Sequence, residues 1–338
     1  MITVDAVVGL CRGDEGKGKV CHHLLSQGDY THVLRYAGGG NAGHTIYHEG
    51  KKFVTHQVPA GVFYGIRSVI GPGCVINPEK LVQEIEYLET NGIEASKFLK
   101  IAANAHLITP EHLLLDGQDT TIGTTRTGNG PCYSDKYSRK GIQAKDYPLF
   151  KDKIIHMQEE FYGADQENVI LAEGAQGFYL DVDWGKYPFV TSSHCGIGSV
   201  LLNGFNHKQI RRVYGVAKVY ETYVGADKFE PGFLNGDSVF QKIRELGQEY
   251  GATTGRPRQC NWLNLDELIM AAQMNGVDEI LFNKLDILDQ VGTWMVRWND
   301  GEKYSFDSSF EFQEFVRSEI QACHQCDVRF SSNPHDLT

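Results

Sequence analysis

A glycine-rich stretch near the N-terminus, residues 13–19, constrains the fold of this chain more than any other feature; it reads Gly-Asp-Glu-Gly-Lys-Gly-Lys. An apolar run typical of a buried strand, residues 4–10, precedes it, and a helical pattern through Val20, Leu24 and Leu25 follows it. A strand, a glycine-rich turn and a helix N-terminus together present free backbone N–H groups, which bind phosphate. The stretch is not a Walker A motif, which has four residues between its glycines and then Lys-Ser/Thr. It predicts a phosphate-binding turn, and the alternative is a tight turn with solvated lysines.

The residue types within this stretch fit a phosphate, with one exception. Gly16 lets the backbone approach a ligand closely, and Lys17 and Lys19 can offer ammonium groups to phosphoryl oxygens. Asp14 is the exception, because a carboxylate beside a phosphate repels it unless it binds Mg²⁺ or takes a proton. The stretch therefore predicts chemistry at Asp14 as well as phosphate binding.

The composition excludes several classes of protein. The chain has 338 residues and a net charge of −11, which argues against a general nucleic-acid binder. No apolar run reaches transmembrane length, and the N-terminus lacks a basic segment followed by an apolar core. We therefore expect a cytoplasmic protein whose partners include neither nucleic acid nor membrane.

Strand-like and helix-like patterns alternate along the whole chain, which is typical of an α/β fold with a largely parallel sheet and helices on both faces. The strands are expected at residues 4–10, 32–36, 68–70, 99–103, 169–172, 212–220, 279–283 and 294–298. The helices are expected at residues 78–90, 151–162, 238–250, 265–274 and 310–322. Residues 123–145 are polar and glycine-rich, and we expect one long functional loop there. No linker or repeat interrupts the pattern, so residues 1–338 are predicted to form one domain.

Several special loops follow the predicted strands, where ligands bind in such sheets. After residues 13–19 come, in order, Asn41-Ala42-Gly43-His44-Thr45, Gly123-Thr124-Thr125, Gly128-x-Gly130-Pro131, Glu173-Gly174-Ala175-Gln176-Gly177, Tyr187-Pro188-x-Val190-Thr191-Ser192-Ser193, Gly251-Ala252-Thr253-Thr254-Gly255-Arg256 and Lys284-Leu285-Asp286. This set closely resembles the adenylosuccinate synthetase family, from about Val4 to Gln290. The resemblance implies a P-loop-NTPase-like fold and a nucleotide-dependent ligase that forms a C–N bond.

The family uses GTP to join L-aspartate to C6 of IMP in purine biosynthesis, through a 6-phosphoryl intermediate. By resemblance, Asp14 is the base that removes the N1 proton, and His44 stabilises O6 and the transferring phosphoryl group. Lys17 and Gln176 complete the catalytic set that the resemblance implies. It also implies that Mg²⁺ is held by Asp14 and the backbone carbonyl of Gly43.

The resemblance also assigns residues to each substrate. For the GTP donor they are Gly13, Glu15, Gly16, Lys17, Gly18, Lys19, Arg258, Lys284, Leu285, Asp286, Ser331, Ser332 and Asn333. Among these, the Asp286 carboxylate accepts hydrogen bonds from the guanine, and the Lys284 side chain packs on the guanine ring. For the purine monophosphate they are Asp14, Asn41, Ala42, Gly43, His44, Thr125, Arg139, Gln176, Thr191 and Arg256. For L-aspartate they are Ala252, Thr253, Thr254, Gly255, Arg256 and Arg258. Arg139 matches an arginine that acts from the other subunit, which implies a homodimer.

The chain departs from the family pattern at three places. The usual Gln-Trp before residue 13 is Cys11-Arg12, the usual arginine-rich run is Arg256-Pro257-Arg258-Gln259, and the usual Ser/Thr-Gly-Pro near the end is Ser331-Ser332-Asn333-Pro334. The length resembles compact archaeal and phage members. We expect IMP and GTP as substrates.

Two alternatives stay open. One is a phage-type enzyme that makes the 2-amino adduct from dGMP or GMP for 2-aminoadenine DNA, with ATP or dATP as donor, in the host cytoplasm. The other is a GTP-binding switch, since Lys284-Leu285-Asp286 resembles a guanine-reading motif. The missing Walker A Lys-Ser/Thr argues against the switch.

Overall fold

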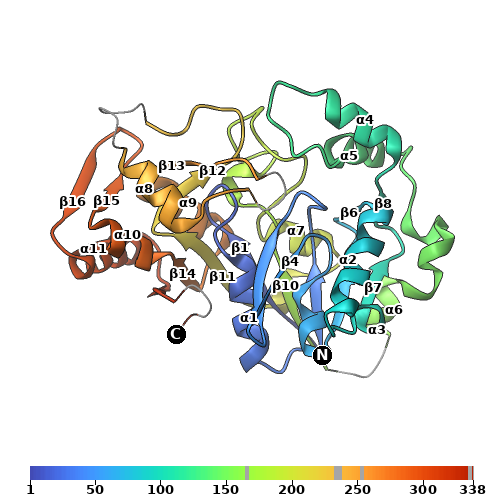
Figure 1. Cartoon of the computed structure of the whole chain (residues 1–338). Coiled ribbons are helices and arrows are strands. Elements are labelled where there is room, and N and C mark those ends of the chain that lie inside the picture. The colour runs from blue at the N-terminus through green and yellow to red at the C-terminus, as the bar shows by residue number, and fades with distance from the viewer. Residues whose placement is uncertain (164–166, 232–237, 252–254, 334–336, 338) are drawn as a thin grey trace.

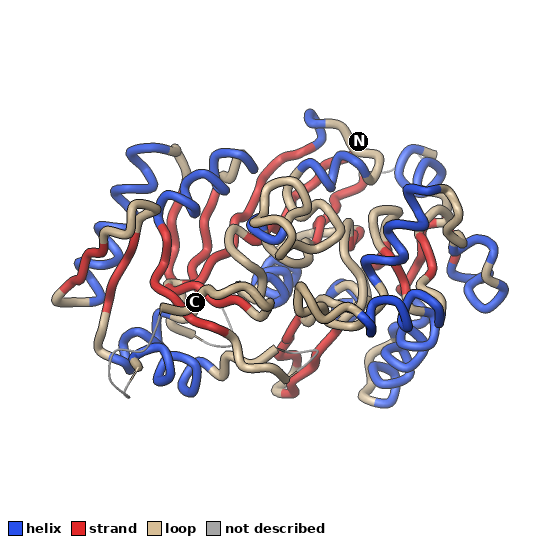
Figure 2. Tube along the Cα trace, turned by 90° about the horizontal axis from the view of Figure 1, so that it is seen from above, coloured by secondary structure: helices blue, strands red, loops and turns tan. Residues whose placement is uncertain are grey.

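The structure, a computed structural model, describes residues 1–163, 167–231, 238–251, 255–333 and 337. Within these residues nine strands form one sheet, in the order β17-β14-β11-β1-β10-β2-β5-β7-β9, and every neighbouring pair in it is parallel. Figure 1 shows this sheet at the centre of the molecule, and the view from above in Figure 2 shows helices on both of its sides. The predicted α/β fold with a largely parallel sheet is confirmed.

The strands of the large sheet are β1 (Ile2–Gly9), β2 (His32–Arg35), β5 (Arg67–Ile70), β7 (Leu99–Ala102), β9 (Ile154–Ile155), β10 (Asn168–Glu173), β11 (Ile210–Lys218), β14 (Glu279–Asn283) and β17 (Asp327–Phe330). A smaller mixed sheet contains β12 (Tyr220–Tyr223), β13 (Gln259–Asn264), β15 (Trp294–Arg297) and β16 (Lys303–Phe306). Two short pairs are β3 (His44–His48) with β4 (Lys51–Thr55), and β6 (Val75–Ile76) with β8 (His106–Leu107).

The α-helices are α1 (Lys17–Gln27), α2 (Pro78–Thr90), α3 (Ala95–Phe98), α4 (Pro110–Gln118), α5 (Asn129–Ser138), α6 (Met157–Tyr162), α7 (Gly198–Leu202), α8 (Val239–Gly247), α9 (Leu265–Asn275), α10 (Leu285–Val291) and α11 (Ser309–Cys323). Short 3₁₀ helices are η1 (Ala60–Tyr64), η2 (Ala144–Asp146), η3 (Pro148–Lys153), η4 (Phe178–Leu180) and η5 (His207–Gln209). None of the described helices is both long enough and apolar enough to cross a membrane.

The central strand β1 is buried on both faces, which explains its unbroken apolar run. Val7 packs in one core cluster with Val20 of α1. Ala6 packs in another cluster with Phe161 of α6 and Val200 of α7. Because successive side chains of a strand point to opposite faces, this alternation places α1 on one side of the sheet and α6 and α7 on the other.

The chain reverses its direction of winding at β1. The strand that follows it in sequence, β2, is separated from β1 by β10, while β11 lies on the other side of β1. In open parallel sheets such a switch point leaves a crevice at the carboxyl ends of the strands. The loop after β1 therefore opens onto the natural ligand site of this fold.

Two expected elements are wrong. Residues 123–145 are not one loop, because α5 begins in them; Pro131 sits in its first turn, where a proline is tolerated. Residues 151–162 are not one helix, because the 3₁₀ helix η3 ends at Lys153, Ile154 and Ile155 form β9 beside β7, and the α-helix α6 begins only at Met157.

Several elements were not expected at all. They include the β3–β4 hairpin, α4, α10, β13, β16 and β17. The expected strand 212–220 ends at Lys218, and Tyr220 begins β12 of the smaller sheet.

Candidate active site

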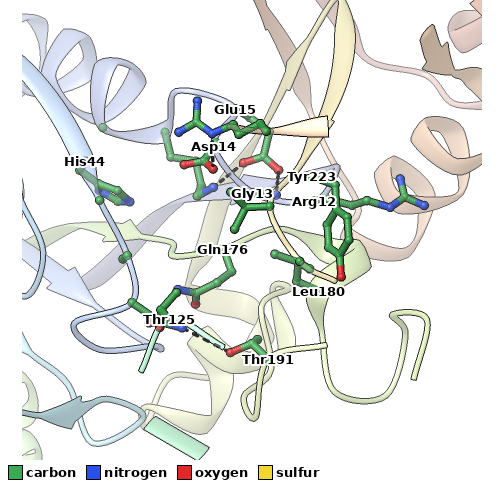
Figure 3. A pocket seen from close by; sticks show the side chains of 18 of the residues that line it. Arg12, Gly13, Asp14, Glu15, His44, Thr125, Gln176, Leu180, Thr191 and Tyr223 are labelled. Carbon is green, nitrogen blue, oxygen red and sulfur yellow. Dashed lines mark hydrogen bonds and ion pairs between the residues drawn. The ribbon is translucent and has the colours of Figure 1, made fainter. Parts of the chain in front are cut away.

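A cavity of about 810 Å³ lies at the carboxyl ends of the central strands. Its walls come from the loops after β1, β2, β10 and β14 and from the end of β11. In Figure 3, Asp14, His44 and Gln176 face the same open space from three of these segments. The switch point of the sheet thus brings together loops that are distant in sequence.

The turn after β1 adopts left-handed backbone angles at Gly13 (φ 83°), Asp14 (φ 59°) and Gly16 (φ 94°). Such angles favour glycine, and the strained aspartate between the two glycines is held by its surroundings. The carboxylate of Glu15 lies beneath the turn and accepts from the backbone N–H groups of Cys11 (3.2 Å) and Gly13 (2.8 Å). Glu15 therefore shapes the turn from inside, although it also borders the cavity.

The two lysines of the turn have different environments. Lys17 is 3% exposed, and its ammonium lies 2.5 Å from the Glu15 carboxylate. The Lys19 ammonium donates to Asn283 Oδ1 (2.9 Å) and Ser331 Oγ (3.0 Å), so it ties α1 to the end of β14 and to the segment after β17. Both side chains border the cavity.

Asp14 begins a chain of alternating charges along one wall. Arg258 Nε lies 2.9 Å from Asp14 Oδ2, a charge pair rather than an aligned hydrogen bond. Arg258 Nη1 is 2.5 Å from Glu249, which also accepts from Lys218 Nζ at 3.0 Å. Burial raises the pKa of Glu249, but Lys218, Arg258 and Lys284 outweigh it and hold that pKa at about 2. Glu249 is therefore a permanent anion that fixes the Arg258 guanidinium over Asp14.

His44, the first residue of β3, is buried and its ring is held by Glu173 of β10. The Nδ1 atom lies 2.5 Å from Glu173 Oε1, which also accepts from Arg35 Nη2 at 2.7 Å. The other carboxylate oxygen accepts from the backbone N–H of Ala60 at 2.8 Å. Glu173 thereby fixes β3 and η1 to the central sheet.

This arrangement sets the protonation of His44. Burial, and after it the Arg35 charge, lower the pKa of His44 to about 4. Burial raises the pKa of Glu173, but Arg35 and His44 outweigh it and lower that pKa to about 2. A carboxylate can only accept, so the proton of the neutral imidazole resides on Nδ1 and Nε2 carries a lone pair.

The opposite end of the cavity is lined by neutral polar side chains. Asn41 Nδ2 donates to Thr191 Oγ1 at 3.5 Å, and Thr125 and Thr127 pair through their hydroxyls at 2.9 Å. Both amide atoms of Gln176 are buried without a hydrogen-bond partner among the described residues. Buried polar groups are normally paired, so the unpaired Gln176 amide marks a place where a ligand group belongs.

A third part of the cavity lies near α8 and the end of β14. Lys284 (φ 71°) donates from Nζ to Gly247 O at 2.8 Å. Burial lowers the pKa of Lys284 and raises that of Asp286. Asp286 and Asn333 border this part of the cavity.

Several expected site residues lie away from the cavity wall. The Arg139 side chain is exposed at the end of α5. Arg256 donates from Nη2 to Gly123 O (2.9 Å) and Thr124 O (3.2 Å), so it supports the wall from behind. Gly255, Leu285, Ser331 and Ser332 are also not among the wall residues, whereas Ala42, Gly43 and Gly18 are. Ala252, Thr253 and Thr254 lie outside the described residues.

Sequence reasoning missed many other wall residues, among them Arg12, Leu180, Lys218, Tyr223, Val224 and Gly225. Lys218 lies near the end of the predicted strand 212–220, and that position was the one signal for it. Arg12 adjoins the glycine-rich turn and stood out only as a departure from the family pattern. The others end η4 or lie at and after the end of β12, and nothing in their local sequence indicates a site.

One group of side chains in the described part of the chain has the spacing of a metal site: Asp181, Asp183 and His194. Asp181 already accepts from the backbone N–H groups of Cys195 (2.6 Å) and Asp183 (3.0 Å). Asp14 is not part of this group.

The parallel sheet has a glycine-rich turn at its switch point, and the cavity there holds lysines, a carboxylate and a histidine fixed by a glutamate. These features define a phosphate-handling α/β enzyme. The comparisons with known proteins narrow that class. The sequence profile described as adenylosuccinate synthetase matches residues 6–161 and 147–334. The chain belongs to the adenylosuccinate synthetase family, whose members are ligases, as the sequence predicted.

Curated relatives agree with the profile. The adenylosuccinate synthetase of Salinibacter ruber is 40% identical over 85% of this chain and 78% of its own length. That of Caldicellulosiruptor saccharolyticus is 38% identical, with 86% and 79% covered.

Solved structures share the fold. Fully ligated adenylosuccinate synthetase from Plasmodium falciparum has a TM-score of 0.85 at 30% identity, covering 99% of this chain and 98% of its own. The cyanophage S-2L succinoaminodeoxyadenylate synthetase, solved with dGMP and dATP as an energy donor, has a TM-score of 0.78 at 23% identity, covering 100% and 94%.

Proposed function

We propose that this protein condenses L-aspartate with C6 of IMP, driven by GTP, to give adenylosuccinate. The observation that carries the proposal is that Asp14, His44 and the unpaired amide of Gln176 border one cavity. Activation of a 6-oxopurine requires a base, a group that stabilises the phosphoryl group and a neutral hydrogen-bonding group. Asp14, His44 and Gln176 can fill these three roles in that order.

The reaction has two steps at this site. Asp14 takes the N1 proton, O6 attacks the γ-phosphorus of GTP, and GDP leaves. The amine of aspartate then attacks C6, and inorganic phosphate leaves with the O6 oxygen. Lys17 and Gln176 bind the oxygens around the transferring group. His44 presents Nε2 to them, and the bound anion raises its pKa so that Nε2 can take a proton and donate.

Mg²⁺ fits the residues present. Asp14 supplies a hard carboxylate oxygen on the cavity wall, and Gly43 borders the same wall. Mg²⁺ is held in such sites by one or two protein oxygens with substrate phosphates and water, and it would neutralise phosphate charge. The nearby Arg258 guanidinium then pairs with substrate anions in place of Asp14.

Each substrate is assigned a part of the cavity. Lys284 and Asp286 bind the guanine, and the turn after β1 binds the donor phosphates. Asn41, Thr125 and Thr191 bind the monophosphate of the acceptor, and Arg258 with residues 252–256 binds L-aspartate. We place the protein in the cytoplasm as one domain, with small molecules as its substrates.

The test is an assay of purified protein with GTP, Mg²⁺, L-aspartate and a purine monophosphate. Phosphate release that requires both aspartate and the monophosphate is expected. Release indifferent to both would instead identify a GTP hydrolase or switch.

The same assay decides the acceptor. We expect kcat/KM for IMP to exceed the values for GMP and dGMP. The departures at Cys11-Arg12 and Pro257 motivate the comparison with dGMP, as does the cyanophage neighbour. ATP and dATP are tested against GTP for the same reason. If dGMP exceeds IMP by more than about tenfold, or ~1.4 kcal/mol of transition-state preference, the phage-type reaction replaces the one proposed.

A homodimer with Arg139 acting in trans is also proposed. Arg139 is exposed and lies off the wall of its own cavity, which suits a residue that reaches a partner's site. Arg139→Leu and Asp14→Asn proteins are each expected to be inactive. Mixing them should restore activity, because one kind of hybrid site carries neither change. No recovery after verified subunit exchange would exclude a shared site.

A further inference from the structure

The two departures at Arg12 and Gln259 meet in the structure at one segment, residues 223–230. Arg12 precedes the phosphate turn and Gln259 begins β13, so they are 247 positions apart in sequence. Gln259 hydrogen-bonds the segment directly, and Arg12 contacts the ring of Phe229 within it.

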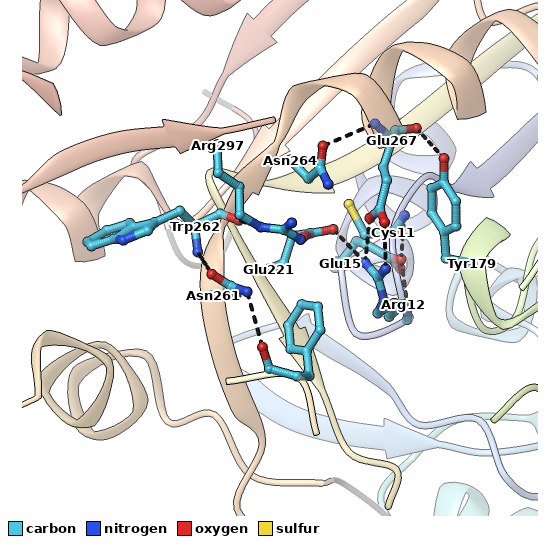
Figure 4. A network of polar contacts seen from close by, with 12 residues as sticks. Cys11, Arg12, Glu15, Tyr179, Glu221, Asn261, Trp262, Asn264, Glu267 and Arg297 are labelled. Carbon is cyan, nitrogen blue, oxygen red and sulfur yellow. Dashed lines mark hydrogen bonds and ion pairs between the residues drawn. The ribbon is translucent and has the colours of Figure 1, made fainter. Parts of the chain in front are cut away.

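The Arg12 guanidinium lies in a network of charges (Figure 4). Its Nη1 donates to Glu221 Oε1 (2.9 Å), and Nη1 and Nη2 donate to the two oxygens of Glu267 (2.8 and 2.9 Å). Arg297 Nη2 donates to the second oxygen of Glu221 at 2.7 Å. Two arginines and two glutamates balance in charge, which is what partly buried ions require.

The ring of Phe229 covers this network. It lies 4.7 Å from the Arg12 guanidinium and 5.9 Å from that of Arg297. Its centroid is 5.9 Å from the ring of Tyr223, at the other end of the segment. Arginine stacks favourably on an aromatic face, so Phe229 binds the segment to the base of the phosphate turn.

Gln259 holds the same segment through its backbone. Its Oε1 accepts from the N–H groups of Phe229 (2.9 Å) and Glu230 (3.1 Å). Its Nε2 donates to the carbonyls of Gly225 (3.3 Å) and Asp227 (2.7 Å). All four hydrogen bonds that this amide makes go to residues 225–230, which an arginine, having no acceptor, could not reproduce.

The segment so held forms part of the cavity wall, through Tyr223, Val224 and Gly225. The Tyr223 ring lies directly against the Cα of Gly225, where any side chain would collide with it. Ala226 N donates to Ile122 O at 3.4 Å, three residues before Thr125, which is assigned to the acceptor. The segment therefore supports the acceptor end of the cavity.

We propose that Arg12 and Gln259 are positioning residues that hold the 223–230 segment in place before any ligand binds, and thereby preform the pocket for the purine monophosphate. The proposal rests on the proposed function. If the wall is ordered before the ligand arrives, binding does not have to order it, and this loss of conformational entropy is avoided. Changes at Arg12 or Gln259 should therefore alter the affinity for the acceptor and not the rate of the chemical steps, because neither residue needs to touch the reacting atoms.

Gln259→Leu tests this inference, since leucine has a similar size but no hydrogen-bonding groups. Hydrogen exchange at the amides of Phe229 and Glu230 should become at least about tenfold faster, because both lose their acceptor. The KM for the monophosphate should rise about five- to tenfold, with kcat and the KM for GTP within about twofold of wild type. Gln273→Leu is the matched control, because Gln273 donates to the backbone carbonyl of Cys323 (2.8 Å) away from the cavity.

Phe229→Leu is a second variant that leaves the Gln259 hydrogen bonds in place. This variant should also raise the KM for the monophosphate, because the segment loses the aromatic ring that stacks on the Arg12 guanidinium. Faster exchange with an unchanged KM would overturn the proposal, and so would a raised KM without faster exchange. If wild-type protein shows no ligase activity, the proposed function fails, whereas the exchange comparison still reports whether the segment is held.

Discussion

Asp14→Asn is expected to lower kcat for ligation by about 10²–10⁴-fold, the range typical for loss of a general base. Asparagine has the same shape but cannot accept the N1 proton. Without that step O6 stays a weak nucleophile, so the phosphoryl intermediate does not form. The variant also loses the charge that attracts Mg²⁺. Initial rates of phosphate release with IMP, GTP and aspartate measure the effect.

The Asp14→Asn protein should fold as wild type does, because Arg258 keeps its 2.5 Å contact with Glu249. Circular dichroism and thermal unfolding check this point. Asp307→Asn, which changes an exposed carboxylate far along the chain, is the control for loss of one charge. A variant that keeps more than about a tenth of wild-type kcat contradicts the role of Asp14 as the base.

Glu15→Leu is expected to reduce the free energy of unfolding by about 3–5 kcal/mol, the usual effect of removing one partner of a buried ion pair. The Lys17 ammonium, 3% exposed, would be left without its carboxylate. The N–H groups of Cys11 and Gly13 would also lose their acceptor. Urea unfolding followed by circular dichroism measures the change.

Lys17→Met and the double variant Glu15→Leu/Lys17→Met complete the cycle. A buried pair replaced by apolar side chains of similar volume is often close to neutral, so the double variant should be more stable than the sum of the single effects predicts. Strict additivity would show that the two charges are not coupled. Lys17→Met and the double variant are expected to lack ligase activity, since Lys17 binds the transferring group in the proposed mechanism.

Local signals in the sequence predicted the elements that depend on them. Helix α2 occupies the expected residues 78–90, because Asn77 caps it, Pro78 suits its first turn and its apolar positions repeat on one face. Strands β1 and β14 follow from apolar runs that are buried on both faces. Helix α5 was not predicted, because its glycine, proline and polar residues are weak helix formers. Tertiary contacts that bury Cys132 and Tyr133 stabilise it in the folded protein.

The sequence by itself determined the family, the α/β fold and the loops that surround the cavity, because parallel strands place their carboxyl ends at one edge. Only the tertiary structure decided which side chains of those loops face a ligand. Glu15 lies in the predicted phosphate stretch, but its carboxylate binds the backbone of the turn from inside. Glu173 lies in a predicted loop motif, but its carboxylate holds His44, which is 129 positions away in the sequence. The contacts of Arg12 and Gln259 with residues 223–230 are likewise invisible in local sequence. Side-chain direction depends on partners brought close by folding, and spacing along the chain carries no record of them.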